Sequence, residues 1–199
     1  MVPWTRALKM VKEGQADIAL GSPPEEAVPH GLIKGSQPIG YGIDCVYVRA
    51  DNPLKYNNRA DDLNSLKKVG TVADFQYYEQ MAEWLQRPEN KSKNFIARGE
   101  TASETNLIQL SLGRLDGLME TSAVIDYLIM QKKLEGKVRI AGCHKPQAVF
   151  NLISPQRKDA RQLAAELDSG ILALEKDGKV QPILERYGVH QWKIINKAQ

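Results

Sequence analysis

A pattern of amphipathic helix, Gly-x-x-Asp and apolar strand occurs twice in this chain, at positions far apart in the sequence. The two copies run from Ala7 to Leu20 and from Leu107 to Met119, around Gly14-x-x-Asp17 and Gly113-x-x-Asp116. In each copy, apolar residues at helical spacing end at a glycine that can take the left-handed conformation, and the residues after Asp suit a buried strand. Two such segments predict two similar α/β lobes. Junctions of this kind also recur by chance in α/β proteins, and a repeat this short leaves that alternative open.

The composition is that of a soluble globular protein able to bury a core. The chain has 199 residues, enough for one large or two small domains, with 42% hydrophobic and 26% charged residues. A net charge of +3 from scattered Lys and Arg argues against nucleic acid as a partner. No apolar run approaches the length of a membrane span, and the first residues lack the features of a signal peptide. Taken literally, these features predict a cytoplasmic chain.

The cysteine and histidine residues do not form a recognisable metal or nucleophile motif. Cys45 and Cys143 show neither CxxC nor Cys/His ligand spacing, and the three histidines are dispersed, so we expect no metal site and no cofactor. His144 lies beside Cys143, but adjacent residues rarely face each other, and we do not expect a catalytic cysteine.

Apolar periodicity and turn residues predict alternating helices and strands. Helices are expected at Trp4–Lys12, Gln76–Leu85, Thr101–Leu112, Ala123–Lys133, Asp159–Lys176 and Val180–Arg186. Strands are expected at Ile18–Leu20, Ile43–Arg49, Lys68–Val72, Phe95–Arg98, after Asp116, and at Val138–Ala141 and Ala148–Ile153. Thr101 and Glu104 have the spacing of a capping box.

The order of these elements predicts a complete lobe in the middle of the chain. The segment from about Asp51 to Lys145 reads as a compact lobe built on a parallel sheet. The outer lobe reads as incomplete, because a single strand before Ser22 plus the last two helices cannot close a sheet of similar size. The segment Gly31–Ile39 is predicted to be irregular.

Short motifs along nearly the whole chain follow the order found in one protein family. They are Pro3-Trp4-x-Arg6-Ala7-Leu8, Gly14-x-x-Asp17, Gly35-Ser36-x-Pro38, the strand Cys45 to Arg49, Val69-Gly70-Thr71, Gly113-Arg114-Leu115-Asp116, and Glu175-x-Asp177-Gly178 with Ile183 and Tyr187-Gly188. As an ordered set they resemble the extracellular solute-binding proteins of family 3, which feed amino acids and similar small solutes to ABC transporters.

This resemblance implies an α/β fold of the periplasmic-binding-protein type II class, with two lobes joined by two hinge strands. Lobe 1 would comprise residues 1–47, lobe 2 residues 48–147, and residues 148–199 would return to lobe 1 and form the C-terminal helices. The hinge strands would be about Val46 to Asp51 and Ala148 to Ser154. Because the family starts with a signal peptide, a strand and a helix, the resemblance implies a periplasmic protein that lacks the N-terminal part of lobe 1.

The resemblance also places a ligand site at the turns that line the cleft between the lobes. Lobe 1 of the family carries Ser-x-Thr-x-x-Arg, whose arginine clamps a carboxylate. Here the loop is Ser22-Pro23-Pro24-Glu25-Glu26, so Glu26 stands where the arginine would be. The corresponding lobe 2 positions are Asp74, Phe75, Gln76 and Tyr77, and the family's amine-binding Asp matches Thr121, with Glu120 beside it.

These residues predict a neutral or cationic solute, since a carboxylate would meet repulsion from the acidic loop. Each also has a simpler interpretation. Glu25 and Glu26 could belong to a solvated loop, Phe75 could pack in a core, and Asp17 and Asp116 are better explained as turn residues than as ligands.

The predicted function is therefore binding of an amino acid or related amine for delivery to an ABC transporter permease, without catalysis. The protein is expected to be a monomer, with possible association through the truncated lobe 1, because an exposed sheet edge can pair with another chain. Two alternatives remain. One is a ligand-sensing module of a receptor, and the other is a periplasmic dehydratase-like enzyme on the same fold, in which Glu120 would transfer protons.

The hinge assignment carries one further expectation, for the two cysteines. If the hinge strands run antiparallel with Val48 near Phe150, Cys45 lies at the lobe 1 end of its strand. Cys143 precedes the return strand on the lobe 2 side, several residues away. Both thiols are then predicted to stay unpaired.

Overall fold

The structure is a computed structural model that describes residues 4–73, 75–77 and 79–188. The chain divides into two compact units, unit 1 with residues 1–42 and 146–199 and unit 2 with residues 43–145. It crosses between the units at residues 42/43 and 145/146, whereas the sequence places these crossings at 47/48 and 147/148. None of the described helices is both long and apolar enough to cross a membrane.

Unit 1 is organised around a strand that comes late in the sequence. Its elements are α1 (Trp4–Lys12), β1 (Ile18–Ser22), a 3₁₀ turn (Pro24–Glu26), α2 (Ala27–His30), β2 (Ile33–Lys34), β3 (Gly40–Gly42), β9 (Gln147–Ile153), α6 (Ala160–Lys176) and α7 (Val180–Glu185). β1, β2 and β3 all pair antiparallel with β9 and form a four-stranded sheet. The expectation that Gly31–Ile39 is irregular is wrong at Ile33–Lys34, which forms β2. The sheet therefore has more than the single strand before Ser22, because β2 and β3 also pair with β9.

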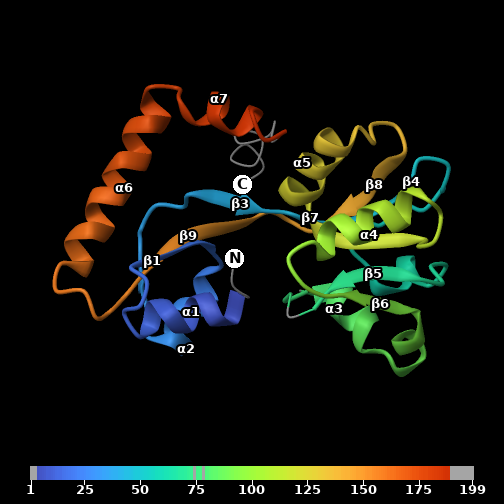
Figure 1. Ribbon diagram of the computed structural model, residues 1–199, viewed down its shortest axis with the longest axis horizontal. Coiled ribbons are helices and arrows are strands. Elements are labelled where there is room, and N and C mark those ends of the chain that lie inside the picture. Colours follow the sequence, from blue (N-terminus) through green and yellow to red (C-terminus); the bar gives the residue numbers. More distant parts are fainter. Residues whose placement is uncertain (1–3, 74, 78, 189–199) are drawn as a thin grey trace. The chain divides into compact units, whose positions relative to one another are not determined.

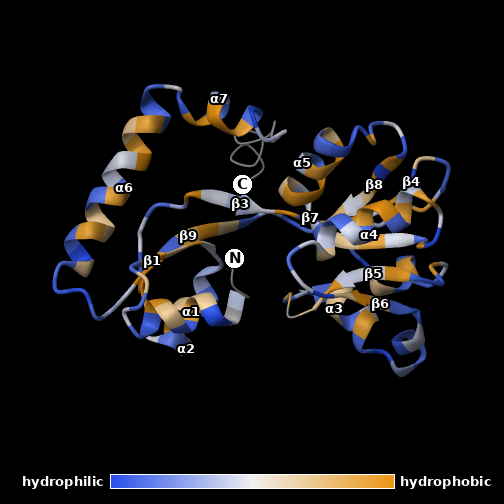
Figure 2. Cartoon of the chain, in the orientation of Figure 1, coloured by the Kyte–Doolittle hydropathy of each residue, from blue (hydrophilic) through white to orange (hydrophobic). Residues whose placement is uncertain are grey.

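Two layers of helices cover the two faces of the unit 1 sheet. Neighbouring residues of β9 point to opposite faces, so Leu152 packs against α1 and α2 while Ile153 packs against α6. Figure 1 shows α1 and α2 on one side of β1 and β9 and α6 on the other. Hydrophobic and hydrophilic residues alternate along α1 and α6, as expected for helices with one buried face (Figure 2).

Unit 2 contains a five-stranded sheet in the order β6-β5-β7-β4-β8. Its elements are β4 (Asp44–Arg49), β5 (Val69–Val72), α3 (Glu79–Gln86), β6 (Asn94–Ala97), α4 (Ala102–Ser111), β7 (Gly117–Thr121), α5 (Ser122–Lys132) and β8 (Val138–Cys143), with 3₁₀ turns at Ala60–Leu63 and Pro88–Lys93. β5, β6 and β7 are parallel, but β4 is antiparallel to both β7 and β8. The sheet is therefore mixed, and not parallel throughout as the sequence predicts.

The core of unit 2 lies on both faces of this sheet. On one face Val46, Val48 and Met119 pack around the fully buried Trp84 of α3. On the other face Tyr47 and Leu118 pack against α4 and α5. β4 therefore contributes alternate residues to the cores on both faces of the sheet.

The two Gly-x-x-Asp junctions have the local structure that the sequence predicts. Gly14 and Gly113 end their helices with φ values of 75° and 72°, in the left-handed region. Asp116 accepts backbone N–H groups of Lys67 and Lys68 at 3.0 and 2.9 Å. The aspartate therefore fixes the turn that leads into β5, which agrees with its interpretation as a turn residue.

The capping box is not formed. Thr101 precedes α4, but its side chain makes no capping hydrogen bond. Glu104 instead forms an ion pair with Lys132 of α5, with 2.6 Å between the charged atoms. The glutamate joins two helices and does not reach back to its own helix end.

The expectation that the two cysteines stay unpaired is wrong, because Cys45 and Cys143 form a disulfide. Cys45 does not lie at the lobe 1 end of a hinge strand, since the whole of β4 belongs to unit 2. Val48 pairs with Arg139, whereas Phe150 pairs with Ser22 in unit 1. Cys45 and Cys143 are thus direct neighbours across β4 and β8, with 4.0 Å between their Cα atoms.

We predict that this disulfide contributes substantially to stability, because it closes a long loop with a sequence separation of 98. Replacing both cysteines by serine should lower the free energy of unfolding by about 2–4 kcal/mol, measured by urea denaturation. A reducing agent should destabilise the native sequence and leave the double variant unchanged. Two thiols labelled by alkylation of the unfolded, unreduced protein would show that the bridge is absent.

Candidate functional site

Polar side chains gather at one end of the unit 2 sheet. The carboxyl ends of the parallel strands β5 and β7 lie there, together with the amino end of the antiparallel β4. Thr121, the last residue of β7, donates its hydroxyl to the Asp44 carboxylate at 2.8 Å. Ligands of open α/β sheets bind outside the carboxyl ends of the strands, which makes this edge the candidate site.

Glu120 is a buried member of this group. Its side chain is 3% exposed, and its two oxygens accept hydrogen bonds from the Ser103 hydroxyl at 2.6 Å and from the Thr121 N–H at 2.9 Å. Burial raises the pKa of Glu120, while these two hydrogen bonds act in the opposite direction. Glu120 therefore links β7 to the start of α4 from inside the unit.

Asp44 is a site residue that the sequence does not reveal. It is half-buried at the start of β4, and loss of hydration raises the pKa of its carboxyl, against the hydrogen bond from Thr121 and the charge of His144. Its backbone carbonyl accepts the His144 N–H at 2.9 Å. Only the sheet order could identify this residue, because its neighbours Thr121 and His144 are distant in the sequence.

Tyr77 joins the ends of the two parallel strands. Its hydroxyl accepts the Val72 N–H at 2.9 Å and donates to the Met119 carbonyl at 3.2 Å. The Phe75 ring contacts the Tyr77 ring, with 4.9 Å between centroids, and Gln76 is exposed. These residues form the turn before α3, which begins at Glu79 and not at Gln76 as predicted. Asp74 lies outside the described residues.

A hydrogen-bonded network continues from Asp44 through His144. The imidazole Nε2 lies 3.3 Å from the Tyr56 hydroxyl, and Nδ1 lies 3.3 Å from a Glu79 carboxylate oxygen. Asn58 accepts a hydrogen bond from Tyr56 and donates one to Glu79. The network ties the segment after β8 to the first residue of α3, and the sequence contains no signal for it.

The predicted lobe 1 residues lie together in unit 1, at the end of β1. Ser22 is fully buried, and its hydroxyl has no hydrogen-bond partner among the described residues. Glu25 is exposed, whereas Glu26 accepts the Trp4 indole N–H at 2.8 Å. Glu26 thus holds the end of the 3₁₀ turn against α1, in addition to any role in binding.

The charge of the unit 2 site favours a positive ligand. Within the described part of the chain, neither Asp44 nor Glu120 forms an ion pair with a lysine or arginine. Carboxylates removed from water without a counter-charge are costly, and a ligand cation would relieve that cost. Asp44, which is half-buried and accepts one side-chain hydrogen bond, from Thr121, can therefore accept further hydrogen bonds from an ammonium or guanidinium group.

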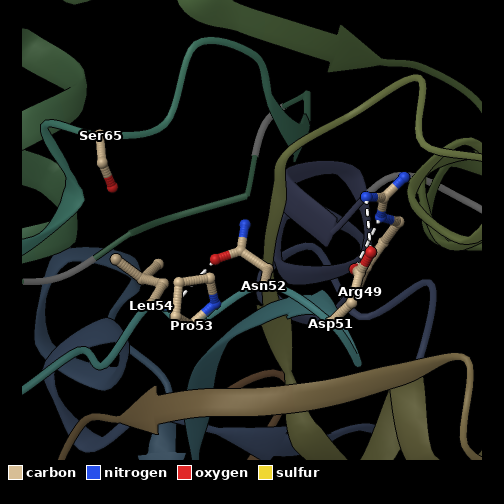
Figure 3. A pocket seen from close by; sticks show the side chains of 6 residues that line it. All are labelled: Arg49, Asp51, Asn52, Pro53, Leu54 and Ser65. Atoms are coloured by element: carbon tan, nitrogen blue, oxygen red, sulfur yellow. Dashed lines mark hydrogen bonds and ion pairs between the residues drawn. The ribbon is translucent and has the colours of Figure 1, made fainter.

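A surface hollow at the opposite end of β4 has different chemistry (Figure 3). It is lined by Arg49, Asp51, Asn52, Pro53, Leu54 and Ser65. Arg49 donates two hydrogen bonds to Asp51, at 3.1 and 3.0 Å, as the dashed lines in Figure 3 show. Its guanidinium is committed to this pair, and the hollow is separate from the candidate site because it lies at the other end of the strand.

The buried carboxyl predicts a distinct pH dependence of stability. The pKa of Glu120 in the folded state lies above the ordinary value of 4.5, so between these two pKa values the folded protein binds more protons than the unfolded protein. The contribution of Glu120 to the free energy of unfolding therefore falls as pH rises from 4.5 through the folded-state pKa. Glu120→Gln should remove this fall, which is at most about 1.4 kcal/mol per pH unit. Urea unfolding at a series of pH values measures it.

The exposed Glu25 provides the matched control for that experiment. Glu25→Gln should leave the fall in stability in place, because this variant keeps the buried Glu120 carboxyl. Equal profiles for Glu120→Gln and the native protein would contradict the buried position of Glu120.

Comparison with known proteins finds similarity in structure alone. No protein-family model matches the chain, and no curated protein matches it either. The probable amino-acid ABC transporter extracellular-binding protein YtmK from Bacillus subtilis is 17% identical, with a TM-score of 0.68 over 96% of this chain and 78% of that chain. The amino acid ABC transporter substrate-binding protein AbpA from Streptococcus pneumoniae, solved with L-arginine, is 20% identical, with a TM-score of 0.65 over 94% and 73%.

A third similar structure is a histidine kinase sensor domain with similarity to periplasmic binding proteins. It is 19% identical, with a TM-score of 0.65 over 93% of this chain and 75% of that chain. At these identities the likeness concerns the fold, and it confirms the predicted class. The chain has the mixed α/β fold of the type II periplasmic binding proteins.

Proposed function

We propose that this protein binds a small polar solute that carries a positive charge, an amino acid or a related amine, for delivery to an ABC transporter. The observation that carries the proposal is the arrangement of Asp44, Thr121 and Glu120 at the end of the unit 2 sheet. Both carboxyl groups have raised pKa values because they are removed from water. A cationic group at this end of the sheet would compensate their charge.

The fold supports binding as the activity. Proteins of this fold include AbpA, which was solved with L-arginine. In the proposed mechanism the solute binds at the carboxyl ends of the parallel strands of unit 2, the usual ligand position in open α/β sheets. Fold likeness alone does not define a ligand, and the choice of a cation rests on the carboxyl groups of this chain.

Individual roles follow from the contacts of each residue. Thr121 donates to Asp44, so the carboxylate is oriented and keeps acceptor capacity for a solute ammonium group. Ser22 offers a buried hydroxyl without a partner among the described residues, which suits a polar group of the solute. Asp74, Phe75, Gln76 and Tyr77 complete the proposed set in unit 2, and Glu25 and Glu26 in unit 1.

The proposal includes a periplasmic location, a transporter permease as partner, and no turnover of the solute. A ligand-sensing role is the second candidate, favoured by the likeness to a histidine kinase sensor domain. Both roles require solute binding, so binding is tested first. Stimulation of ATP hydrolysis by a reconstituted transporter would then favour transport over sensing.

A ligand screen tests the proposed class. L-arginine, L-lysine and putrescine should raise the melting temperature, since a solute at a hundred times its Kd stabilises the folded state by about 2.7 kcal/mol. L-glutamate and L-malate should not. Asp44→Asn should raise the Kd of the cationic solute about tenfold or more, measured by calorimetry, because it removes a charged hydrogen-bond partner.

Asp51→Asn is the matched control for this variant. Asp51 is an exposed aspartate beyond the other end of β4, and its replacement should leave the Kd unchanged. Tight binding of a dicarboxylate that Asp44→Asn does not alter would overturn the cationic class. Consumption of the bound solute over time would overturn the absence of turnover.

A further inference from the structure

The disulfide is formed by residues that pair directly with, or lie next to, residues of the candidate site in the unit 2 sheet. Across the sheet, Cys45 pairs with Glu120 on one side and with Cys143 on the other. In the next row, Asp44 pairs with Thr121 and its carbonyl accepts the N–H of His144. The residues directly before Cys45 and directly after Cys143 are therefore both members of the polar group.

The backbone ladder between β4 and β8 is irregular at this end of the sheet. A register shift between Val46 and Tyr47 interrupts the pairing of β4 with β8. The pairs that Cys45 and Val46 form with β8 are therefore separated from the continuous pairing of residues 47–49. β8 is an edge strand, and it ends at Cys143, near the point where the chain leaves unit 2. Strand ends of this kind open more easily than the middle of a sheet.

We propose that the Cys45–Cys143 disulfide is a positioning element for solute binding, which holds the Asp44 carboxylate in the place where it meets the solute. This inference rests on the proposed function and assigns the two cysteines a role in affinity in addition to stability. The bridge joins β4 to β8 inside unit 2, so it constrains the site and leaves both crossings between the units free.

The chemistry of the bridge makes the affinity dependent on redox state. Reduction by a dithiol such as dithiothreitol breaks the S–S bond with two electrons and two protons, yields two thiols, and converts the dithiol to its cyclic disulfide. Cys45 is fully buried and Cys143 is half-buried, so a variant without cysteines is a cleaner probe than a reductant alone.

A double-mutant cycle tests the role. The variant Cys45→Ser/Cys143→Ser should bind the cationic solute about tenfold more weakly than the native protein, comparable to the loss of one charged hydrogen bond. In the background of Asp44→Asn the same double replacement should change the Kd by less than about twofold, because the group that the bridge positions is already gone. Calorimetry measures all four Kd values below the melting temperature of the least stable variant.

Leu110→Ala provides a control for general destabilisation. Leu110 is fully buried in the core of unit 2, at the other end of α4 from Ser103, and its truncation should lower the melting temperature without changing the Kd. If the cysteine replacements weaken binding equally in both backgrounds, or lower only the melting temperature, the positioning role is wrong. If the oxidised native protein binds none of the cationic solutes, the proposed function fails before the cycle is measured.

Discussion

The antiparallel insertion of β4 between β7 and β8 is the constraint on which unit 2 depends. Alternate residues of β4 enter the two cores, so the strand joins the α3 face to the face covered by α4 and α5. Its direction also brings Asp44 to the edge where the parallel strands end. A parallel β4 would place Arg49 there, so that a guanidinium would stand in place of the Asp44 carboxylate.

The candidate site combines two carboxyl groups that differ in environment. Glu120 has both oxygens engaged by the protein and is almost fully buried, which suits a structural link between β7 and α4. Asp44 is half-buried and is held by one side-chain donor, Thr121. The more exposed of the two is thus the better placed for contact with a solute, although the sequence resemblance indicates positions 120 and 121.

Regular elements with a clear period are the part of the fold that the sequence predicts well. The bounds of α1 agree at Trp4 and Lys12, and both glycines of the repeated junction take the left-handed conformation. These features depend on local physics, namely helical spacing and the lack of a Cβ atom at glycine. The fold class also agrees, because the order of motifs reflects the order of elements.

The errors concern contacts between residues that are distant in the sequence. The disulfide was beyond prediction from spacing, since it depends on the boundary between the two units, which lies at residues 42/43 and leaves the whole of β4 in unit 2. The capping box failed because Glu104 found a stronger partner in Lys132 on another helix. Asp44 and His144 were missed for the same reason, as their partners are fixed only by the order of strands in the sheet.

The dependence of unit 1 on β9 also sets an order of assembly. Unit 2 is one continuous stretch of chain, whereas β1, β2 and β3 must wait for residues 147–153 before any of them has its sheet partner. During synthesis from the N-terminus, the middle of the chain can therefore reach its native fold first. β1, β2 and β3 acquire their sheet partner only after the ribosome has translated residues 147–153, which makes this pairing the high-contact-order, slow step of folding.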